Sequence, residues 1–94
     1  MSEIIDQAVA ALSAKVDSFD GSAKFVIENE GSIVLDGAGV RESDDDTDVT
    51  LTASAETFQA IMEGDVNPTM AFMQGKLKID GSMGEAMKLA SVLG

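Results

Sequence analysis

The side chains best suited to chemistry in this chain are carboxylates, and they are densest in the run from Glu42 to Asp48. Counted from Asp44, aspartates stand at the first, third and fifth positions, which is the spacing that opens a calcium-binding loop. Such a loop continues with glycine and ends with glutamate at its twelfth position, where this chain has Val49 and Ala55. We therefore favour a solvated connection over a metal site for this run.

Catalytic chemistry has few other candidates in the sequence. There is no histidine and no cysteine, so the usual general base and the most reactive nucleophile are both absent. No serine stands in a Gly-x-Ser-x-Gly turn, and Lys76 and Lys78 fall on the water-facing side of an expected strand. The glycines near Gly37 and Gly75 lack the spacing of a nucleotide-binding loop. We expect no catalytic residues, no cofactor and no enzymatic activity.

Overall composition narrows the remaining classes of function. The 94 residues carry a net charge of −11, with 6 basic against 17 acidic side chains, which opposes nucleic-acid binding and stable membrane insertion. No apolar stretch approaches the roughly 18 residues of a spanning helix, and no signal-peptide pattern opens the chain. We expect residues 1–94 to form a single cytoplasmic domain. An acidic surface that docks a basic partner stays open as an alternative.

Hydrophobic periodicity predicts a helix at the start of the chain. The helix is expected to be capped by Ser2, and the segment is expected to end at Asp20 and Gly21. Its apolar stripe consists of Ile5, Val9, Leu12 and Val16, with Ile4, Ala8 and Ala11 beside it. Such a stripe is typical of a helix that packs on a sheet.

Four strands follow in the first half of the chain. Alternation of apolar and polar residues predicts them near residues 24–28, 32–36, 40–42 and 49–53. The alternation directs Ile33 and Leu35 inward and Val34 outward. The turn after the second strand contains Asp36 and Gly37, a pair that favours a hairpin because glycine accepts a positive φ.

Two helices are expected next. Ser54 is a suitable cap for the first of them, and Gly64 is a suitable end. Asn67 followed by Pro68 opens a shorter helix, because proline at the first helical position loses no hydrogen bond. Gly75 is expected to end that helix.

The chain closes with a half-buried strand near residues 76–80 and a last helix. Ser82 and Glu85 have the spacing of a capping box at the start of that helix. Its expected inner stripe consists of Met83, Ala86, Met87 and Ala90. The order of elements predicts an α+β domain with a mainly antiparallel five-stranded sheet covered on one face by helices.

The helices of the second half are rich in methionine. They carry Met62, Met70, Met73, Met83 and Met87. Methionine is flexible and polarizable, so a wall made of it suits either plastic core packing or a cavity for a flexible apolar ligand. Composition alone favours ordinary core packing.

A combination of short motifs fills the segment from Asn67 to Leu89. The motifs are Asn67-Pro68, Ala71-Phe72, Gly75-Lys76-Leu77-Lys78-Ile79, Gly81, Met83 and Ala86-Met87-Lys88-Leu89. In this combination the segment resembles the C-terminal signature of the sterol carrier protein type 2 family of non-specific lipid-transfer domains. The order of elements resembles that family from about Phe25 to Leu93. The resemblance implies a hydrophobic tunnel between sheet and helices that takes sterols, fatty acids, fatty acyl-coenzyme A or phospholipids.

Because of this resemblance, we interpret the methionines as the wall of a cavity rather than as ordinary core packing. The residues expected to bind lipid are Phe25, Ile27, Leu51, Met62, Met70, Phe72, Met73, Ile79, Met83 and Met87. Met73 stands where relatives often have a second aromatic residue, and the chain is small, so a fatty acid or fatty acyl-coenzyme A is favoured over a sterol, and an isoprenoid stays open as a ligand.

Our hypothesis from the sequence is a non-catalytic intracellular lipid carrier. Its expected partners are the apolar lipid itself and either a partner enzyme or a transient membrane contact. The alternative is an acidic accessory module whose core is filled by its own side chains and whose charged face binds another protein.

Overall fold

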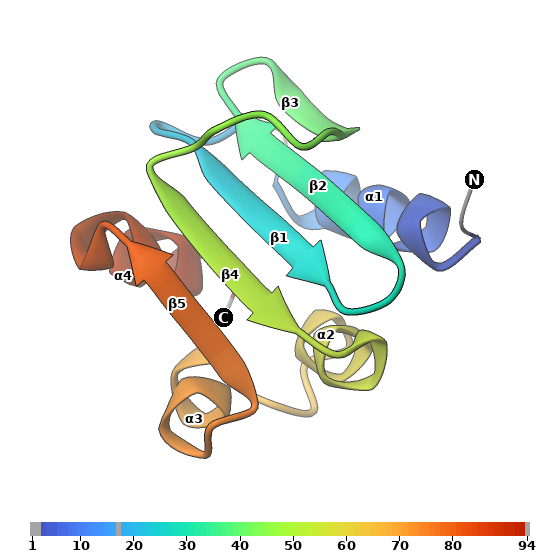
Figure 1. The fold of residues 1–94 in the computed structure, drawn as a ribbon, viewed down its shortest axis with the longest axis vertical. Coiled ribbons are helices and arrows are strands. Elements are labelled where there is room, and N and C mark those ends of the chain that lie inside the picture. Colours follow the sequence, from blue (N-terminus) through green and yellow to red (C-terminus); the bar gives the residue numbers. More distant parts are fainter. Residues whose placement is uncertain (1–2, 17, 94) are drawn as a thin grey trace.

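The computed structural model describes residues 3–16 and 18–93, and in this part of the chain helices cover one face of a sheet (Figure 1). The elements are α1 (Glu3–Lys15), β1 (Ala23–Ile27), β2 (Gly31–Asp36), β3 (Gly39–Glu42), β4 (Val49–Ala53), α2 (Ala55–Met62), α3 (Pro68–Met73), β5 (Leu77–Gly81) and α4 (Met83–Leu93). The predicted α+β class is confirmed. No helix in the described ranges is both long and apolar enough to cross a membrane.

The sheet has the strand order β3-β2-β1-β4-β5, so the last strand of the chain lies beside the fourth. Every neighbouring pair is antiparallel except β1 and β4, which run parallel with Phe25 opposite Leu51. The prediction of a mainly antiparallel sheet is therefore confirmed, with one parallel pair at its centre. Because β3 and β4 both run parallel to β1, their connection must travel back along the sheet and past β2 and β1.

The acidic connection, residues 43–48, makes this crossing on the face of the sheet opposite the helices (Figure 1). The Asp44 carboxylate lies 3.3 Å from the Nζ atom of Lys24 on β1. The Ser32 hydroxyl on β2 donates a hydrogen bond to the Ser43 carbonyl at 2.8 Å. The connection is therefore attached to the two strands that it crosses.

Val34 is buried, with 1% of its surface exposed, although strand alternation predicts that it faces solvent. Its neighbours in register are Lys24 on one side and Arg41 on the other. Both cations hold the acidic connection, since Lys24 pairs with Asp44 and the Arg41 guanidinium lies 3.6 Å from the Asp45 carboxylate. The outward prediction for Val34 is wrong because this remote segment covers it.

A further ion pair fixes the β2–β3 hairpin. The Arg41 guanidinium lies 3.0 Å from the Asp36 carboxylate. The hydrogen bond from Arg41, helped by one from the Ala38 amide, lowers the pKa of the Asp36 carboxyl from its ordinary value. The hairpin therefore keeps a charged Asp36 at its turn.

Helix α1 packs against β2, β3 and α2. The predicted cap, Ser2, lies outside the described residues. The helix ends at Lys15, earlier than the expected limit at Asp20, because Phe19 is buried and its amide donates to the Asp36 carbonyl at 3.1 Å. The buried residues of the helix are Ile5, Ala8 and Leu12.

Helices α2 and α3 begin and end as their sequences predict. Ser54 and Asn67 each accept a hydrogen bond from a backbone amide in the first turn, at 3.1 Å and 2.8 Å. Gly64 and Gly75 follow the two C-caps with φ angles of +82° and +78°. Both local signals are confirmed because capping depends on hydrogen bonds between residues close in sequence.

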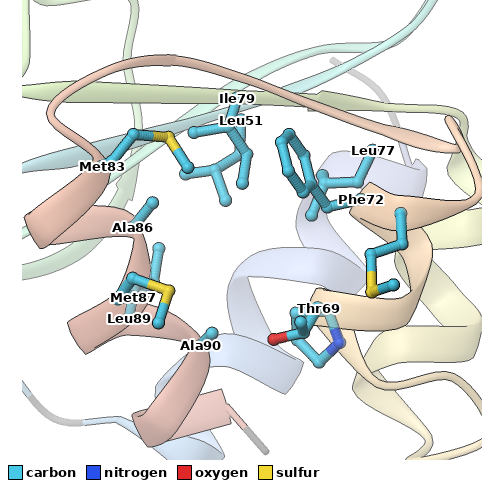
Figure 2. Close-up of a pocket in the computed structure, with 12 residues that line it drawn as sticks. Leu51, Thr69, Phe72, Leu77, Ile79, Met83, Ala86, Met87, Leu89 and Ala90 are labelled. Atoms are coloured by element: carbon cyan, nitrogen blue, oxygen red, sulfur yellow. The ribbon is translucent and has the colours of Figure 1, made fainter.

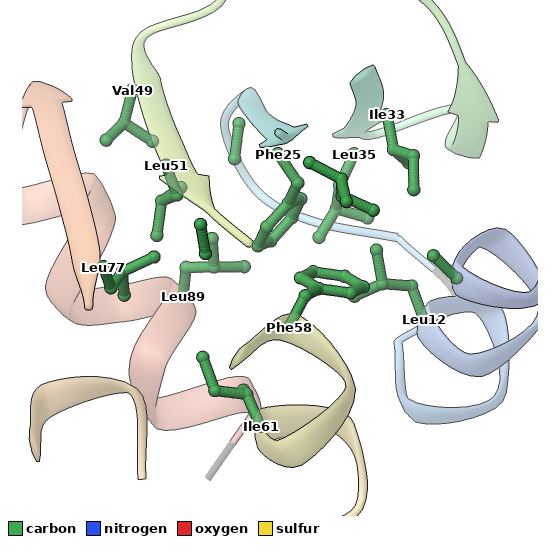
Figure 3. Packing of buried hydrophobic residues seen from close by; sticks show 14 of the residues in the cluster. Leu12, Phe25, Ile33, Leu35, Val49, Leu51, Phe58, Ile61, Leu77 and Leu89 are labelled. Atoms are coloured by element: carbon green, nitrogen blue, oxygen red, sulfur yellow. The ribbon is translucent and has the colours of Figure 1, made fainter. Parts of the chain in front are cut away.

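The core lies between the sheet and the helices, and it holds no buried charged or polar side chain in the described ranges (Figure 3). Phe25 on β1 and Phe58 on α2 pack edge to face, with ring centroids 5.5 Å apart and planes at 66°. Leu12 from α1, Leu35 from β2 and Leu89 from α4 belong to the same cluster. Rings and branched side chains thus fill this part of the molecule.

Gly81 ends β5 at a point where a side chain does not fit. Its φ angle is +104°, and a Cβ atom there would lie 2.5 Å from the Asp48 carbonyl oxygen. We predict that Gly81→Ala lowers the free energy of unfolding by at least about 2 kcal/mol, because backbone strain and the backbone clash add. Urea unfolding followed by circular dichroism measures the change.

Gly84 on α4 provides the matched control. A Cβ atom there would meet nothing closer than the Ser82 hydroxyl at 3.8 Å. Since alanine is a better helix former than glycine, Gly84→Ala is expected to raise the free energy of unfolding by up to about 1 kcal/mol. A Gly81→Ala variant as stable as the wild type would contradict the close approach of β5 to Asp48.

Candidate functional site

A cavity of about 220 Å³ lies where the sheet edge formed by β4 and β5 meets α3 and α4. Figure 2 shows side chains of α4 and α3 facing each other across it, with Leu51 and Ile79 of the sheet on a third side. The lining residues are Leu51, Pro68, Thr69, Phe72, Met73, Leu77, Ile79, Met83, Ala86, Met87, Leu89 and Ala90. The cavity is thus built by β4 and the last three elements of the chain.

Alternation along β5 decides which of its side chains face the cavity. Leu77 and Ile79 line it, whereas Lys78 and Asp80 lie on the other face of the strand and are exposed. Ile79 lies opposite Leu51 of β4 in the antiparallel register. The two strands therefore present one continuous apolar floor.

Helix α3 forms one wall. Thr69, Phe72 and Met73 fall on one helical face, and all three line the cavity. Ala71 points instead into the core, where its exposed fraction is 0%. Because the small alanine takes the core side, the ring of Phe72 stays at the wall and remains 40% exposed.

Helix α4 forms the opposite wall. Its most buried line runs through Ala86 and Leu89, which are 3% and 0% exposed. Met83 and Met87 lie beside this line and border the opening of the cavity. The predicted inner stripe omitted Leu89, the residue that anchors the helix in the core.

The start of α4 is held by Asp48, the last residue of the acidic connection before β4. The Ser82 hydroxyl accepts a hydrogen bond from the Glu85 amide at 3.3 Å, as in a capping box. The Ser82 amide, however, donates to the Asp48 carbonyl at 3.0 Å. Only one arm of the predicted capping box therefore forms, because the Asp48 carbonyl of the acidic connection satisfies the other donor.

Charged residues on the far side of α4 tie it to the segment between α1 and β1. The Lys88 amine donates to the Asp20 carbonyl at 3.0 Å and lies 5.9 Å from the centre of the Phe19 ring. The Glu85 carboxylate lies 3.7 Å from the same amine and packs against Gly21. These contacts keep the charges of α4 away from the cavity.

Three methionines, here called the groove methionines, border the opening. Met73 is 79% exposed, Met87 is 65% exposed and Met83 is 49% exposed. Each has an unbranched thioether side chain with several rotatable bonds. The width of the opening therefore depends on methionine rotamers as well as on the backbone.

The lining of the cavity is almost entirely apolar. Of the described residues that line it, Thr69 alone has a polar side chain and none is charged. Within residues 3–16 and 18–93, no group of carboxylates, histidines or cysteines could hold a metal ion. Such a surface binds apolar groups by excluding water and presents no positioned acid, base or nucleophile.

The structure brings six of the ten expected lipid-binding residues to the cavity and leaves four elsewhere. The six are Leu51, Phe72, Met73, Ile79, Met83 and Met87. Phe25 and Ile27 lie in the closed core because α2, with its Phe58, covers β1. Met62 lines a separate groove between α1 and α2, and Met70 is 55% exposed on α3 without lining the cavity.

The expected lipid-binding set omitted the other half of the lining. These residues are Pro68, Thr69, Leu77, Ala86, Leu89 and Ala90. Helical spacing from Phe72 and strand alternation from Ile79 could have located Thr69 and Leu77. Ala86 and Ala90 were expected on the inner stripe of the last helix but not as lipid contacts, because small side chains contribute to a cavity by the space they leave empty.

Fold and site together define a small α+β domain with a packed core on one side and an open apolar groove between sheet edge and two helices on the other. A sequence profile described as the SCP-2 sterol transfer family matches residues 1–94. The chain belongs to this family.

Individual relatives agree with this assignment. The chain is 40% identical over 87 residues to hydroxysteroid dehydrogenase-like protein 2 of Xenopus laevis, covering 84% of this chain and 21% of that protein. It is 48% identical over 56 residues to sterol carrier protein 2 of Homo sapiens, covering 60% of this chain and 10% of that protein. The matches thus span only a minor part of these relatives. The solution structure of palmitated SCP2L2 from Aedes aegypti superposes with a TM-score of 0.69 at 26% identity, over 99% of this chain and 95% of that one.

Ala90 allows the cavity to be narrowed without adding charge. It lines the cavity from α4 and is only partly buried. We predict that Ala90→Leu reduces the affinity for an apolar fluorescent dye about tenfold, because the added carbons displace roughly two methylenes' worth of ligand contact. A fluorescence titration measures this change.

Ala10→Leu is the matched control, since Ala10 is exposed on α1 and lies outside the cavity. This variant is expected to take up dye like the wild type. Equal dye affinity in Ala90→Leu and the wild type would place the dye at another surface.

Proposed function

We propose that this domain binds one apolar lipid without chemical change and carries it through water, and that residues 1–94 act as a single lipid-binding unit. The observation that carries the proposal is the cavity lining, which is apolar except for the Thr69 hydroxyl. The proposed ligand is a fatty acid or the acyl chain of a fatty acyl-coenzyme A. The lipid contacts are assigned to Leu51, Phe72, Met73, Ile79, Met83 and Met87, with the smaller lining residues between them.

Membership of the SCP-2 sterol transfer family supports lipid binding in general. The related structure from Aedes aegypti is described as palmitated, which supports a linear acyl chain. The human relative is named a sterol carrier protein, which supports a sterol instead. The choice between these two classes therefore depends on the shape of the cavity in this chain.

The size of the cavity favours a linear chain. Its volume of about 220 Å³ is smaller than the roughly 300–1,000 Å³ of typical ligand pockets, so a ligand must move side chains aside. The groove methionines are flexible and largely exposed, which lets them move at little cost. A slender acyl chain requires a smaller displacement than a rigid fused-ring sterol.

The expected affinity suits a carrier. Burying about fifteen apolar carbons of a long acyl chain at about 0.8 kcal/mol each stabilises the complex by roughly 12 kcal/mol. Loss of translational freedom and ordering of the chain take back about 4 kcal/mol, which leaves about 8 kcal/mol and a dissociation constant on the order of micromolar. A ligand held with this affinity can also leave again, as delivery to an acceptor requires.

The acceptor is proposed to be a partner enzyme or a membrane touched transiently. Among the described residues no charged side chain lines the cavity, so it holds no base to activate the Thr69 hydroxyl, and chemistry on the lipid is proposed to come from another protein or domain. The Xenopus relative carries the name of a dehydrogenase-like protein, and the match covers 21% of its length. Both facts support a lipid-binding module that works beside an enzyme.

Organic extraction of the purified protein followed by mass spectrometry tests the proposal first. We expect a fatty acid or an acyl thioester in amounts approaching one per chain. In delipidated protein, a fluorescent fatty acid is expected to bind with micromolar affinity, and cholesterol is expected to compete at least about tenfold less well because of its rigid shape.

Preferential binding of cholesterol would reassign the ligand class while keeping the carrier function. An extract without lipid, together with no uptake of either ligand, would contradict the carrier function. That result would instead favour a self-filled core and an interaction role for the acidic connection.

Met73 and Met70 offer a matched pair for testing the cavity wall. Both are exposed on α3, but only Met73 lines the cavity. We predict that the double variant Met73→Asp, Met83→Asp binds fatty acid at least about a hundredfold more weakly, because two carboxylates would have to lose water against an apolar chain. Met70→Asp is expected to bind within about twofold of the wild type.

Fluorescence titration gives the affinities, and circular dichroism checks that each variant is folded. A folded double variant with unchanged affinity would remove Met73 and Met83 from the lipid contact surface.

A further inference from the structure

Methionine is the only sulfur-containing residue of this chain that a peroxide can oxidise. The sequence contains six methionines and no cysteine. Peroxides convert exposed methionine into methionine sulfoxide, which cellular reductases can convert back. Any peroxide sensitivity of sulfur in this protein must therefore reside in its thioethers.

The groove methionines combine exposure with a position at the cavity. Met73, Met87 and Met83 are 79%, 65% and 49% exposed, and all three line it. Met70 is exposed to a similar degree, at 55%, but lies outside the lining, and Met62 is only half-buried in the groove between α1 and α2. Among the methionines of residues 3–16 and 18–93, exposure alone thus predicts oxidation at four positions, whereas a consequence for the cavity is predicted at three.

The groove methionines also come from both walls. Met73 belongs to α3, and Met83 and Met87 belong to α4. An acyl chain that entered between these helices would lie against thioethers on either side. Oxidation of a methionine on one wall would therefore place a polar group against an acyl chain that still contacts the other wall.

We propose that the groove methionines are a peroxide-modification site that couples oxidation to loss of lipid affinity. This inference rests on the proposed lipid-binding function. The oxidant is a peroxide, either hydrogen peroxide or a lipid hydroperoxide that the groove itself would admit.

The reaction balances without a further reactant. A lone pair of the thioether sulfur attacks the terminal oxygen of the peroxide, the O–O bond breaks, and a sulfur–oxygen bond forms. The sulfur loses two electrons and the peroxide gains them. The proton carried by that terminal oxygen passes to the departing oxygen, which leaves as water from hydrogen peroxide or as an alcohol from a lipid hydroperoxide.

The sulfoxide product is polar and accepts hydrogen bonds. Among the lining residues, Thr69 alone has a side-chain donor that could satisfy it. The new oxygen atoms must therefore keep their water, and an acyl chain seated against them would remove it. Lipid affinity should fall for this reason.

The fold should tolerate the change. Met73, Met83 and Met87 are absent from the buried core cluster and from the half-buried residues packed on it. Their oxidation leaves the Phe25–Phe58 contact and the sheet untouched. Oxidation is thus expected to weaken lipid binding without lowering the stability of the fold, and the experiment measures both.

The experiment treats delipidated protein with hydrogen peroxide and then titrates it with a fluorescent fatty acid. Peptide mass spectrometry is expected to find one added oxygen at each of Met73, Met83 and Met87. The affinity of the wild type is expected to fall at least about tenfold, and methionine sulfoxide reductases are expected to restore it. Circular dichroism should stay unchanged throughout.

Two sets of leucine substitutions separate the groove from other sites, because leucine keeps the apolar volume but cannot be oxidised. The triple variant Met73→Leu, Met83→Leu, Met87→Leu is expected to lose less than about twofold of its own untreated affinity. The matched double variant Met62→Leu, Met70→Leu is expected to show the full loss of the wild type.

Unchanged affinity of wild type that is oxidised at all three positions would overturn the inference. So would an equal loss in the triple variant, or a loss that accompanies unfolding. If untreated wild type binds no fatty acid, the proposed ligand class is overturned, and this inference is overturned with it.

Discussion

The pairing of β5 with β4 is the contact on which the groove depends. It sets Ile79 opposite Leu51 and brings Gly81 against the Asp48 carbonyl, which also accepts the hydrogen bond from the first amide before α4. Because α3 leads directly into β5 and α4 leaves it, both walls of the groove are positioned by this one edge strand. Backbone hydrogen bonds of the sheet therefore hold the walls apart, and the side chains between them do not have to fill the space. Gly81 is essential to this arrangement, since only a residue without a Cβ atom lets the strand approach so closely.

The buried core and the groove differ in how their side chains pack. Around Phe25 and Phe58, rings and branched side chains pack against one another in the buried cluster, as is typical of a core that specifies one structure. In the groove, unbranched thioethers stand at the opening, and small residues such as Ala86 and Ala90 lie between them. Flexible side chains contribute less to a unique packing, but they let a small cavity widen around a ligand. Exposing the apolar groove methionines to water lowers stability, and the fold tolerates this loss because the packed core and the sheet supply the stability.

Local features of this fold could be predicted well, and remote ones could not. The caps at Ser54 and Asn67 were predictable because each is one hydrogen bond between residues two or three positions apart. Burial of Val34 was not predictable from strand alternation, because the segment that covers it crosses from another part of the chain. The predictions for the site divide in the same way between local features and remote ones. Helical and strand periodicity identified Ile79, Phe72 and the groove methionines as apolar faces, yet the same reasoning placed Phe25 and Ile27 with them.

The sequence by itself determined the elements, their apolar faces and the class of function. Capping residues, alternation and methionine-rich helices are local properties that the sequence alone displays. Only the tertiary structure decided which apolar face is sealed and which stays open. Phe58 of α2 closes the surface over β1, whereas the alanines of α4 leave space beside β4 and β5. The physical reason is that a cavity is the difference between the volume that the elements enclose and the volume of their side chains. That difference depends on the distances between elements, and no periodicity within one element contains them.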